Sequence, residues 1–302
     1  MYADSVRLLL SVAPTVFRSN VFALKGGTAL NLFVHDLPRL SVDIDVVYTP
    51  WLEPREAALS AIASELDRIA GNVRQLGLNA RAIRGDTADE TKLLVEDASS
   101  QIKIEVNTVF RGTVLSVQSR GLVPAAADAF ATEMQLPTLA PDELYGSKLV
   151  AALDRQHPRD LFDVRKMYED GGLTVDTVEC FVTYLAGHNR PIHEVLFSND
   201  KDISAEYNNQ FVGMTREPVN LETLLAARDQ LRRELPAALT PDQRRFLVSL
   251  ANAEPDWHLL RCEHAAELPA LRWKLENLRK FRRSRAADFE RQARLLEELL
   301  RH

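Results

Sequence analysis

The segment SVDIDVVY, near the start of the chain, alternates polar and hydrophobic residues, and this constrains the fold more than any other feature. Val42, Ile44 and Val46 would share one face of an extended strand. Asp43 and Asp45 would point to the other face. A strand of this kind needs a sheet beside it and a packed layer on its apolar side, so we predict an α/β region with a carboxylate-bearing face.

A glycine pair precedes this strand. A strand-like apolar run leads into Gly26 and Gly27, and a short helical pattern follows them. Bare backbone at such a turn can approach phosphate oxygens, and the N-terminus of the following helix favours an anion. Lys25 and Thr28 add a cation and a hydroxyl on either side of the glycines, and Ser41 shares the face of the two aspartates. The turn is therefore a candidate site for binding phosphate.

The remaining pattern separates two parts of the chain. Residues 54–70 predict a helix that ends at Gly71. Strand-like runs follow at residues 79–83, 92–96 and 101–109. From Pro124 the strand signals fade, and helical patterns dominate at residues 142–154, 159–170, 221–235, 241–252, 268–281 and 285–300, with a polar loop or boundary at 198–220. We predict an α/β domain over residues 1–123, with a small mixed sheet and flanking helices, and a mainly α-helical domain over residues 124–302.

Charge and cysteine content exclude several classes of protein. The 302 residues have a formal net charge of −6, which argues against a protein that coats nucleic acid with its whole surface. The two cysteines cannot form a disulfide framework and are typical of a reducing compartment. The first residues lack a basic leader, and no apolar stretch approaches the ~20 residues that span a bilayer. We therefore expect a cytoplasmic protein without a membrane partner.

Three carboxylates are candidate metal ligands. Asp43 and Asp45 lie two apart on one strand and could share a divalent cation, and Glu105, in the similar strand pattern QIKIEVN, is a third candidate. Carboxylates at the ends of adjacent strands can hold the metal ions of an in-line displacement. The alternative is a solvated strand face, on which Glu105 pairs with Lys103 or Lys92.

A second cluster of charged residues lies further along the chain. Lys148 falls in one predicted helix, and Arg159, Asp160 and Asp163 fall in the next, which begins after His157. A short helical hairpin would bring Lys148 close to Asp160. From the residues alone this segment is interpreted as structural, because acidic residues favour the first turn of a helix and Arg159 and Asp163 form an ordinary i,i+4 pair.

These motifs together resemble the nucleotidyltransferase superfamily of DNA polymerase β-like fold, and within it the AbiEii/AbiGii (MenT-like) toxins of toxin–antitoxin systems. The resemblance rests on FALKGGTALNLF, RLSVDIDVVY, IKIEVN and SKLVAALDRQHPRDLFDV, which are spread over the first 170 residues. The glycine pair and the paired aspartates indicate the superfamily, and the segment that contains Lys148 and Asp160 is similar to the toxin branch.

The resemblance implies a metal-dependent nucleotidyltransferase that transfers a nucleoside monophosphate from an NTP to an acceptor hydroxyl. Its catalytic residues would be Asp43, Asp45, Lys148 and Asp160, with Mg²⁺ or Mn²⁺ as cofactor. Lys148 would contact nucleotide phosphates, and Asp160 would act as a base or orient Lys148. It further implies an active site between the two domains, the 3′ end of tRNA as the first acceptor, inhibition of translation and growth, and a cognate antitoxin as partner.

Other functions stay open on the sequence alone. The same kind of site could nucleotidylate or phosphorylate a protein, and a degenerate site could bind nucleotide without catalysis. The C-terminal segment, residues 271–302, contains ten basic and five acidic residues, unlike the acidic chain as a whole. Two interpretations fit it: a solvated helix face, or a surface that holds a nucleic-acid backbone. Walker-type, GxSxG and HExxH motifs are absent from the sequence.

Overall fold

The computed structural model describes residues 2–84 and 90–301, which form two units. The first comprises Met1–Leu144 and Gly213–Glu217, and the second comprises Tyr145–Val212 and Pro218–His302. Each unit has its own hydrophobic core. In the described part of the chain, no helix combines the length and the apolar character needed to cross a membrane.

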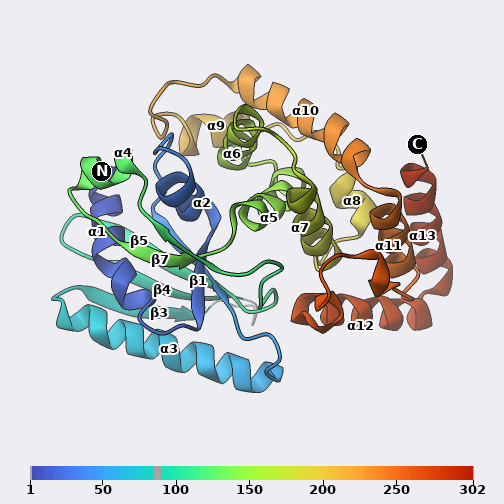
Figure 1. The fold of residues 1–302 in the computed structure, drawn as a ribbon, viewed down its shortest axis with the longest axis horizontal. Coiled ribbons are helices and arrows are strands. Elements are labelled where there is room, and N and C mark those ends of the chain that lie inside the picture. The colour runs from blue at the N-terminus through green and yellow to red at the C-terminus, as the bar shows by residue number, and fades with distance from the viewer. Residues whose placement is uncertain (1, 85–89, 302) are drawn as a thin grey trace. The chain divides into compact units, whose positions relative to one another are not determined.

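A seven-stranded mixed sheet forms the centre of the first unit (Figure 1). Its order is β3-β4-β5-β2-β1-β7-β6, with β2 antiparallel to β1 and parallel to β5. The predicted mixed sheet is thus confirmed, and the aspartate strand β2 is central. The strands are β1 (Phe22–Lys25), β2 (Asp43–Tyr48), β3 (Asn79–Arg84), β4 (Glu90–Glu96), β5 (Gln101–Asn107), β6 (Gln118–Gly121) and β7 (Gln135–Thr138).

The helices of this unit flank the sheet. They are α1 (Tyr2–Val16), the short α2 (Gly26–Ala29), which runs into a π-helical segment η1 (Leu30–Val34), α3 (Arg55–Gln75) and α4 (Pro124–Phe130). Helices α1 and α3 contact one another and the strands. The prediction that α3 ends at Gly71 is wrong. A side chain at Gly71 would have open space around it, and the chain leaves the helix only before Gly77, whose φ is +81°.

Two strands of the sheet were not predicted, and they change the extent of the first unit. Strand β7 pairs in parallel with β1 and antiparallel with β6. Because β7 lies beyond residue 124, the first unit extends to Leu144 and not to residue 123. Strand β7 has four residues and includes Pro137, so it shows neither the length nor the alternation of a recognisable strand.

The second unit is helical, as predicted. The helices are α5 (Pro141–Asp154), whose first turn belongs to the first unit, α6 (Pro158–Glu169), α7 (Val175–Ala186), α8 (Ile192–Leu196), α9 (Ser204–Gln210), α10 (Leu221–Ala238), α11 (Pro241–Ala251), α12 (Pro269–Ser284) and α13 (Ala286–Leu300), with 3₁₀ turns η2 (Trp257–Leu259) and η3 (Ala265–Glu267).

The stretch expected to be a polar loop contains helix α9. It also returns briefly to the first unit, where Leu40 donates its backbone N–H to the carbonyl of Met214, and Arg39 and Thr215 form an antiparallel bridge. The loop before β2 is therefore held by a segment that lies far along the chain.

Candidate active site

In the first unit the glycine turn lies directly against the aspartate strand. Strands β1 and β2 are paired so that Lys25 is opposite Asp45, and Gly26 follows at the turn with a φ of +74°. A side chain at Gly26 would overlap the carboxylate of Asp45. Glycine is therefore needed here both for its backbone conformation and for the close approach of the carboxylate. The turn and the acidic strand face form one continuous site.

Next to this contact, a hydroxyl and a guanidinium lie close to the second glycine. A side chain at Gly27 would lie 2.7 Å from Nη2 of Arg39 and 3.0 Å from Oγ of Ser41. Thr28 is fully buried, its hydroxyl donates to the backbone carbonyl of Asp43, and it lies 3.0 Å from Oγ of Ser41. The Thr28 hydroxyl thus braces the start of β2 from inside the protein. The Thr28 side chain is buried, and its predicted contact with phosphate stays a prediction.

Glu105 lies beside Asp45 but forms an ion pair. The parallel register of β2 and β5 aligns these two residues, so their side chains share a face. A carboxylate oxygen of Glu105 lies 3.1 Å from Nζ of Lys92 on β4, with about 30% of each side chain exposed. Of the two partners considered from the sequence, Lys92 forms this contact, whereas Lys103 aligns with Asp43.

The acidic face has the donor chemistry that Mg²⁺ requires. Within residues 2–84 and 90–301, no group of three or more His, Cys, Asp or Glu side chains gathers closely enough to hold a metal ion. However, Mg²⁺ is usually held by one or two carboxylates, with substrate phosphates and water completing its octahedron. Asp43 and Asp45 are half-buried on one strand face, and Asp45 contacts the bare backbone of Gly26. Two carboxylates on one strand face supply hard oxygen ligands of the kind that such an ion takes.

In the second unit, helices α5 and α6 bring the predicted lysine and aspartates together. Nζ of Lys148 lies 2.8 Å from Oδ1 of Asp160 and 3.1 Å from Oδ2 of Asp163. Both carboxylates are 1% exposed, and the lysine side chain is 8% exposed. The hairpin that the sequence predicted is formed, and it buries these charges as a mutually neutralising group.

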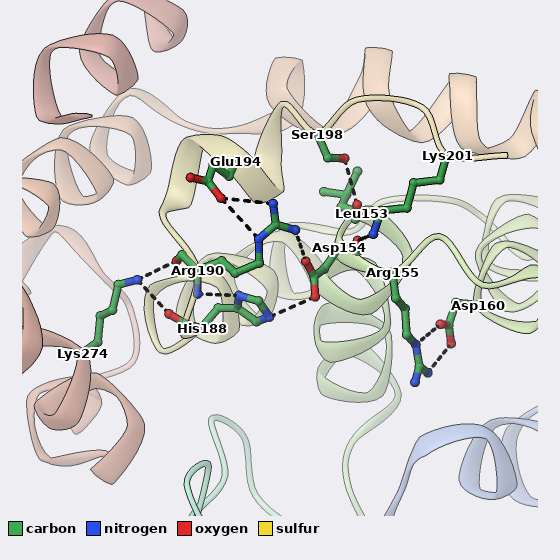
Figure 2. Close-up of polar contacts among 10 residues, drawn as sticks. All are labelled: Leu153, Asp154, Arg155, Asp160, His188, Arg190, Glu194, Ser198, Lys201 and Lys274. Carbon is green, nitrogen blue, oxygen red and sulfur yellow. Dashed lines mark hydrogen bonds and ion pairs between the residues drawn. The ribbon is translucent and has the colours of Figure 1, made fainter. Parts of the chain in front are cut away.

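A residue that the sequence reasoning missed completes this cluster. Arg155, at the end of α5, binds Asp160 with two nitrogens: Nε lies 2.5 Å from Oδ2 and Nη2 lies 3.0 Å from Oδ1 (Figure 2). Its side chain is 62% exposed, so the buried carboxylate is linked to the surface. Burial alone would raise the pKa of Asp160, but the charges of Lys148 and Arg155 outweigh it and hold that pKa well below its usual range. The carboxyl group is therefore ionised and has both oxygens occupied.

Local sequence explains the geometry of the hairpin. His157 caps α6, since its Nδ1 accepts the backbone N–H of Arg159, and Pro158 occupies the first helical position. Gly146 lets α5 approach α7 closely, because a side chain there would overlap Cys180. Asp154 at the end of α5 accepts a hydrogen bond from Nη1 of Arg190, at 2.5 Å (Figure 2). The chain is thus fixed before Arg155 by the end of α5 and after it by the capped start of α6.

Comparison with solved structures identifies the fold. MenT4, a nucleotidyltransferase toxin from Mycobacterium tuberculosis H37Rv, is similar over 91% of this chain and 93% of its own, with a TM-score of 0.63 and 16% sequence identity. The fold is that of a nucleotidyltransferase toxin. The profile of the family described as nucleotidyl transferase AbiEii toxin, type IV toxin–antitoxin system, matches residues 7–277. The chain belongs to this family, and the resemblance seen in its motifs is confirmed. No curated protein sequence matches the chain.

Membership defines the broad activity. The chain is a nucleotidyltransferase, a class of enzyme that uses an NTP as substrate. It belongs to a toxin family whose systems include an antitoxin.

Proposed function

We propose that this protein transfers a nucleoside monophosphate from an NTP to the 3′-terminal hydroxyl of tRNA, and so inhibits translation. The observation that carries the proposal is the contact between the backbone of Gly26 and the carboxylate of Asp45. This contact supports the proposal because the turn would bind phosphate and the strand face would bind the metal ion, so the two groups would lie next to each other. The acceptor hydroxyl would release its proton to solvent as its oxygen forms a bond to the α-phosphorus, and the bond between the α-phosphorus and the pyrophosphate oxygen would break.

The first unit would supply the nucleotide turn and the metal ligands. Asp43 and Asp45 would hold Mg²⁺ or Mn²⁺, which when bound offsets phosphate charge and favours departure of pyrophosphate. Lys25, Gly26, Gly27 and Ser41 would contact the phosphates, and Thr28 would position the start of β2 through the carbonyl of Asp43. Glu105 would serve as a third ligand only when released from Lys92.

In the second unit, Lys148 would place a compact positive charge on the nucleotide phosphates. We assign Asp160 the role of orienting Lys148, in preference to that of general base. A carboxylate with a strongly lowered pKa is a weak base at neutral pH, and its two oxygens already accept from Lys148 and Arg155. Asp163 accepts from the same ammonium group and restricts it further.

The test traces the label of a labelled NTP to the molecule that receives it. Parent protein and an Asp43→Asn/Asp45→Asn variant are incubated with Mg²⁺, deacylated tRNA, cell lysate and NTPs labelled at the α or the γ position. The proposal expects α-label on RNA with the parent and none with the variant. Label from the γ position would indicate a kinase, and α-label on protein would indicate protein nucleotidylation. Equal growth inhibition by parent and variant in cells would indicate a non-catalytic module.

A further inference from the structure

Helix α12 presents a row of arginines that the catalytic proposal does not use. Arg272, Arg279 and Arg283 are all exposed and follow one another at intervals of seven and four residues. At this spacing they lie along one side of the helix, over about 16 Å. The arginine row is the name used below for these three residues.

The arginine row faces outward because the opposite side of α12 packs against other parts of the second unit. Nζ of Lys274 donates to the backbone carbonyls of His188 and Arg190, at 2.8 and 2.6 Å, and the lysine is 6% exposed (Figure 2). Leu271 is buried on the same side, and Phe281 packs edge-on against Phe289 of α13. These contacts set the rotation of the helix about its axis.

The arginines of the row lack the carboxylate partners that neighbouring arginines have. Among the residues that the structure describes, the side chains of Arg272, Arg279 and Arg283 form no ion pair or hydrogen bond. By contrast, Arg282 pairs with Glu254, and both Arg285 and Arg291 pair with Asp288. The sole acid in the sequence of α12, Glu276, pairs with Lys280 at 2.7 Å. None of the three arginines is therefore held in an ion pair, although Glu276 lies one helical turn from Arg272 and from Arg279.

An exposed aromatic ring adjoins the row. Trp273 is 46% exposed, and Nζ of Lys280 lies 5.8 Å from the centroid of its ring. Arginines that match phosphate geometry, next to an exposed tryptophan on which a base can stack, form the combination that binds single strands and strand ends of nucleic acid. An acidic protein surface would use the arginines but would not require the ring.

We propose that the arginine row and Trp273 form an RNA-binding surface, on which the arginines contact consecutive phosphates and the tryptophan stacks on an unpaired base. The choice of RNA as partner rests on the proposed function, which requires an RNA acceptor. The surface deepens that function by assigning RNA binding to residues outside the nucleotide site.

Binding of fluorescent deacylated tRNA, measured by anisotropy at several salt concentrations without NTP, tests the row. The variant Arg272→Gln/Arg279→Gln/Arg283→Gln should bind about tenfold or more weakly, and its salt slope should fall by about two to three, because each lost phosphate contact removes 0.7–0.9. The matched control Arg282→Gln/Arg285→Gln/Arg291→Gln removes the same charge from paired arginines and should stay within about twofold of the parent.

Trp273 is tested separately. Trp273→Ala should weaken binding of a single-stranded oligoribonucleotide about fivefold or more, whereas Trp273→Phe should retain most of the affinity. Circular dichroism and thermal unfolding verify that every variant is folded, which is expected for exposed positions.

Several results would overturn the inference. These are an equal loss in both triple variants, no loss in either, or displacement of RNA by polyglutamate at equal charge concentration, which would indicate an acidic protein as partner. The same experiments distinguish failure of the proposed function from failure of the RNA-binding surface. If the row binds RNA but no label is transferred, the catalytic proposal fails and the surface remains. If label transfer to tRNA keeps its KM in the row variant, the surface fails and the catalytic proposal remains.

Discussion

The two charged clusters assigned to catalysis differ in how deeply they are buried. On strand β2, Asp43 and Asp45 are half-buried, and Asp45 lies against the bare backbone of Gly26, whereas Lys148 and Asp160 are buried and pair with one another. The first arrangement leaves part of each acidic side chain exposed, as a ligand-binding site requires. The second is complete within the protein and can hold a fixed charge in one position. Substitutions should therefore separate the clusters: activity alone should be lost in the first, and activity and stability together in the second.

The largest effect is expected from Asp45→Asn. Removing one of two metal-binding carboxylates should lower label transfer by at least about a thousandfold, because several kcal/mol of charge stabilisation are lost. The free energy of unfolding, measured in urea, should change by less than about 1 kcal/mol, since the carboxylate is half-exposed. A loss of stability of several kcal/mol would show that Asp45 is a structural residue, and the comparison would fail.

Asp160→Asn should affect stability as well. The substitution leaves Lys148 and Arg155 without the buried carboxylate that both of them contact, and this should cost about 3–5 kcal/mol of unfolding free energy. The triple variant Lys148→Met/Asp160→Leu/Asp163→Asn removes both buried carboxylate charges together with the lysine that pairs with them, and it should recover much of that stability while remaining inactive. An active triple variant would exclude Lys148 from catalysis.

Gly26→Ala tests the close contact between Gly26 and the carboxylate of Asp45. The added methyl group meets the Asp45 carboxylate and takes a positive φ, so the variant should lose about 2–4 kcal/mol of stability together with most of its activity. Gly77→Ala is the matched control. Its φ is +81° but nothing lies within 4 Å of the added atom, so it should lose about 1 kcal/mol and keep its activity. Equal losses would mean that backbone strain alone accounts for Gly26.

Local patterns in the sequence predicted the cluster of Asp43 and Asp45 on β2 better than the buried cluster of Lys148 and Asp160. The alternation in β2 and the adjacent glycines are short-range features, and strand pairing then aligns Lys25 with Asp45. The role of Arg155 depends on how the hairpin between α5 and α6 turns, which spacing alone does not define. For the same reason β7, which is recognisable only by its partners β1 and β6, and the return of residues 213–217 to the first unit were not predictable.

The smallest effect concerns a buried charge of the second unit that titrates in an accessible range. Burial lowers the pKa of Lys274 to about 8, although the charge of Glu194 acts in the opposite direction. Between this value and the ordinary 10.5, the unfolded chain retains a proton that the folded chain has released, so the free energy of unfolding should rise with pH. From pH 7.5 to 9.5 the rise should be about 2 kcal/mol, measured by urea unfolding at each pH.

Lys274→Met removes the titrating group and should abolish this rise, whatever its effect on stability at a single pH. The pH range ends below the titration of Tyr48, whose pKa burial raises to about 12. If parent and variant show the same slope, Lys274 stays charged in the folded protein across this range. In that case the carbonyls of His188 and Arg190 would stabilise its ammonium group as well as water does. Burying this charge would then not lower the stability of the second unit.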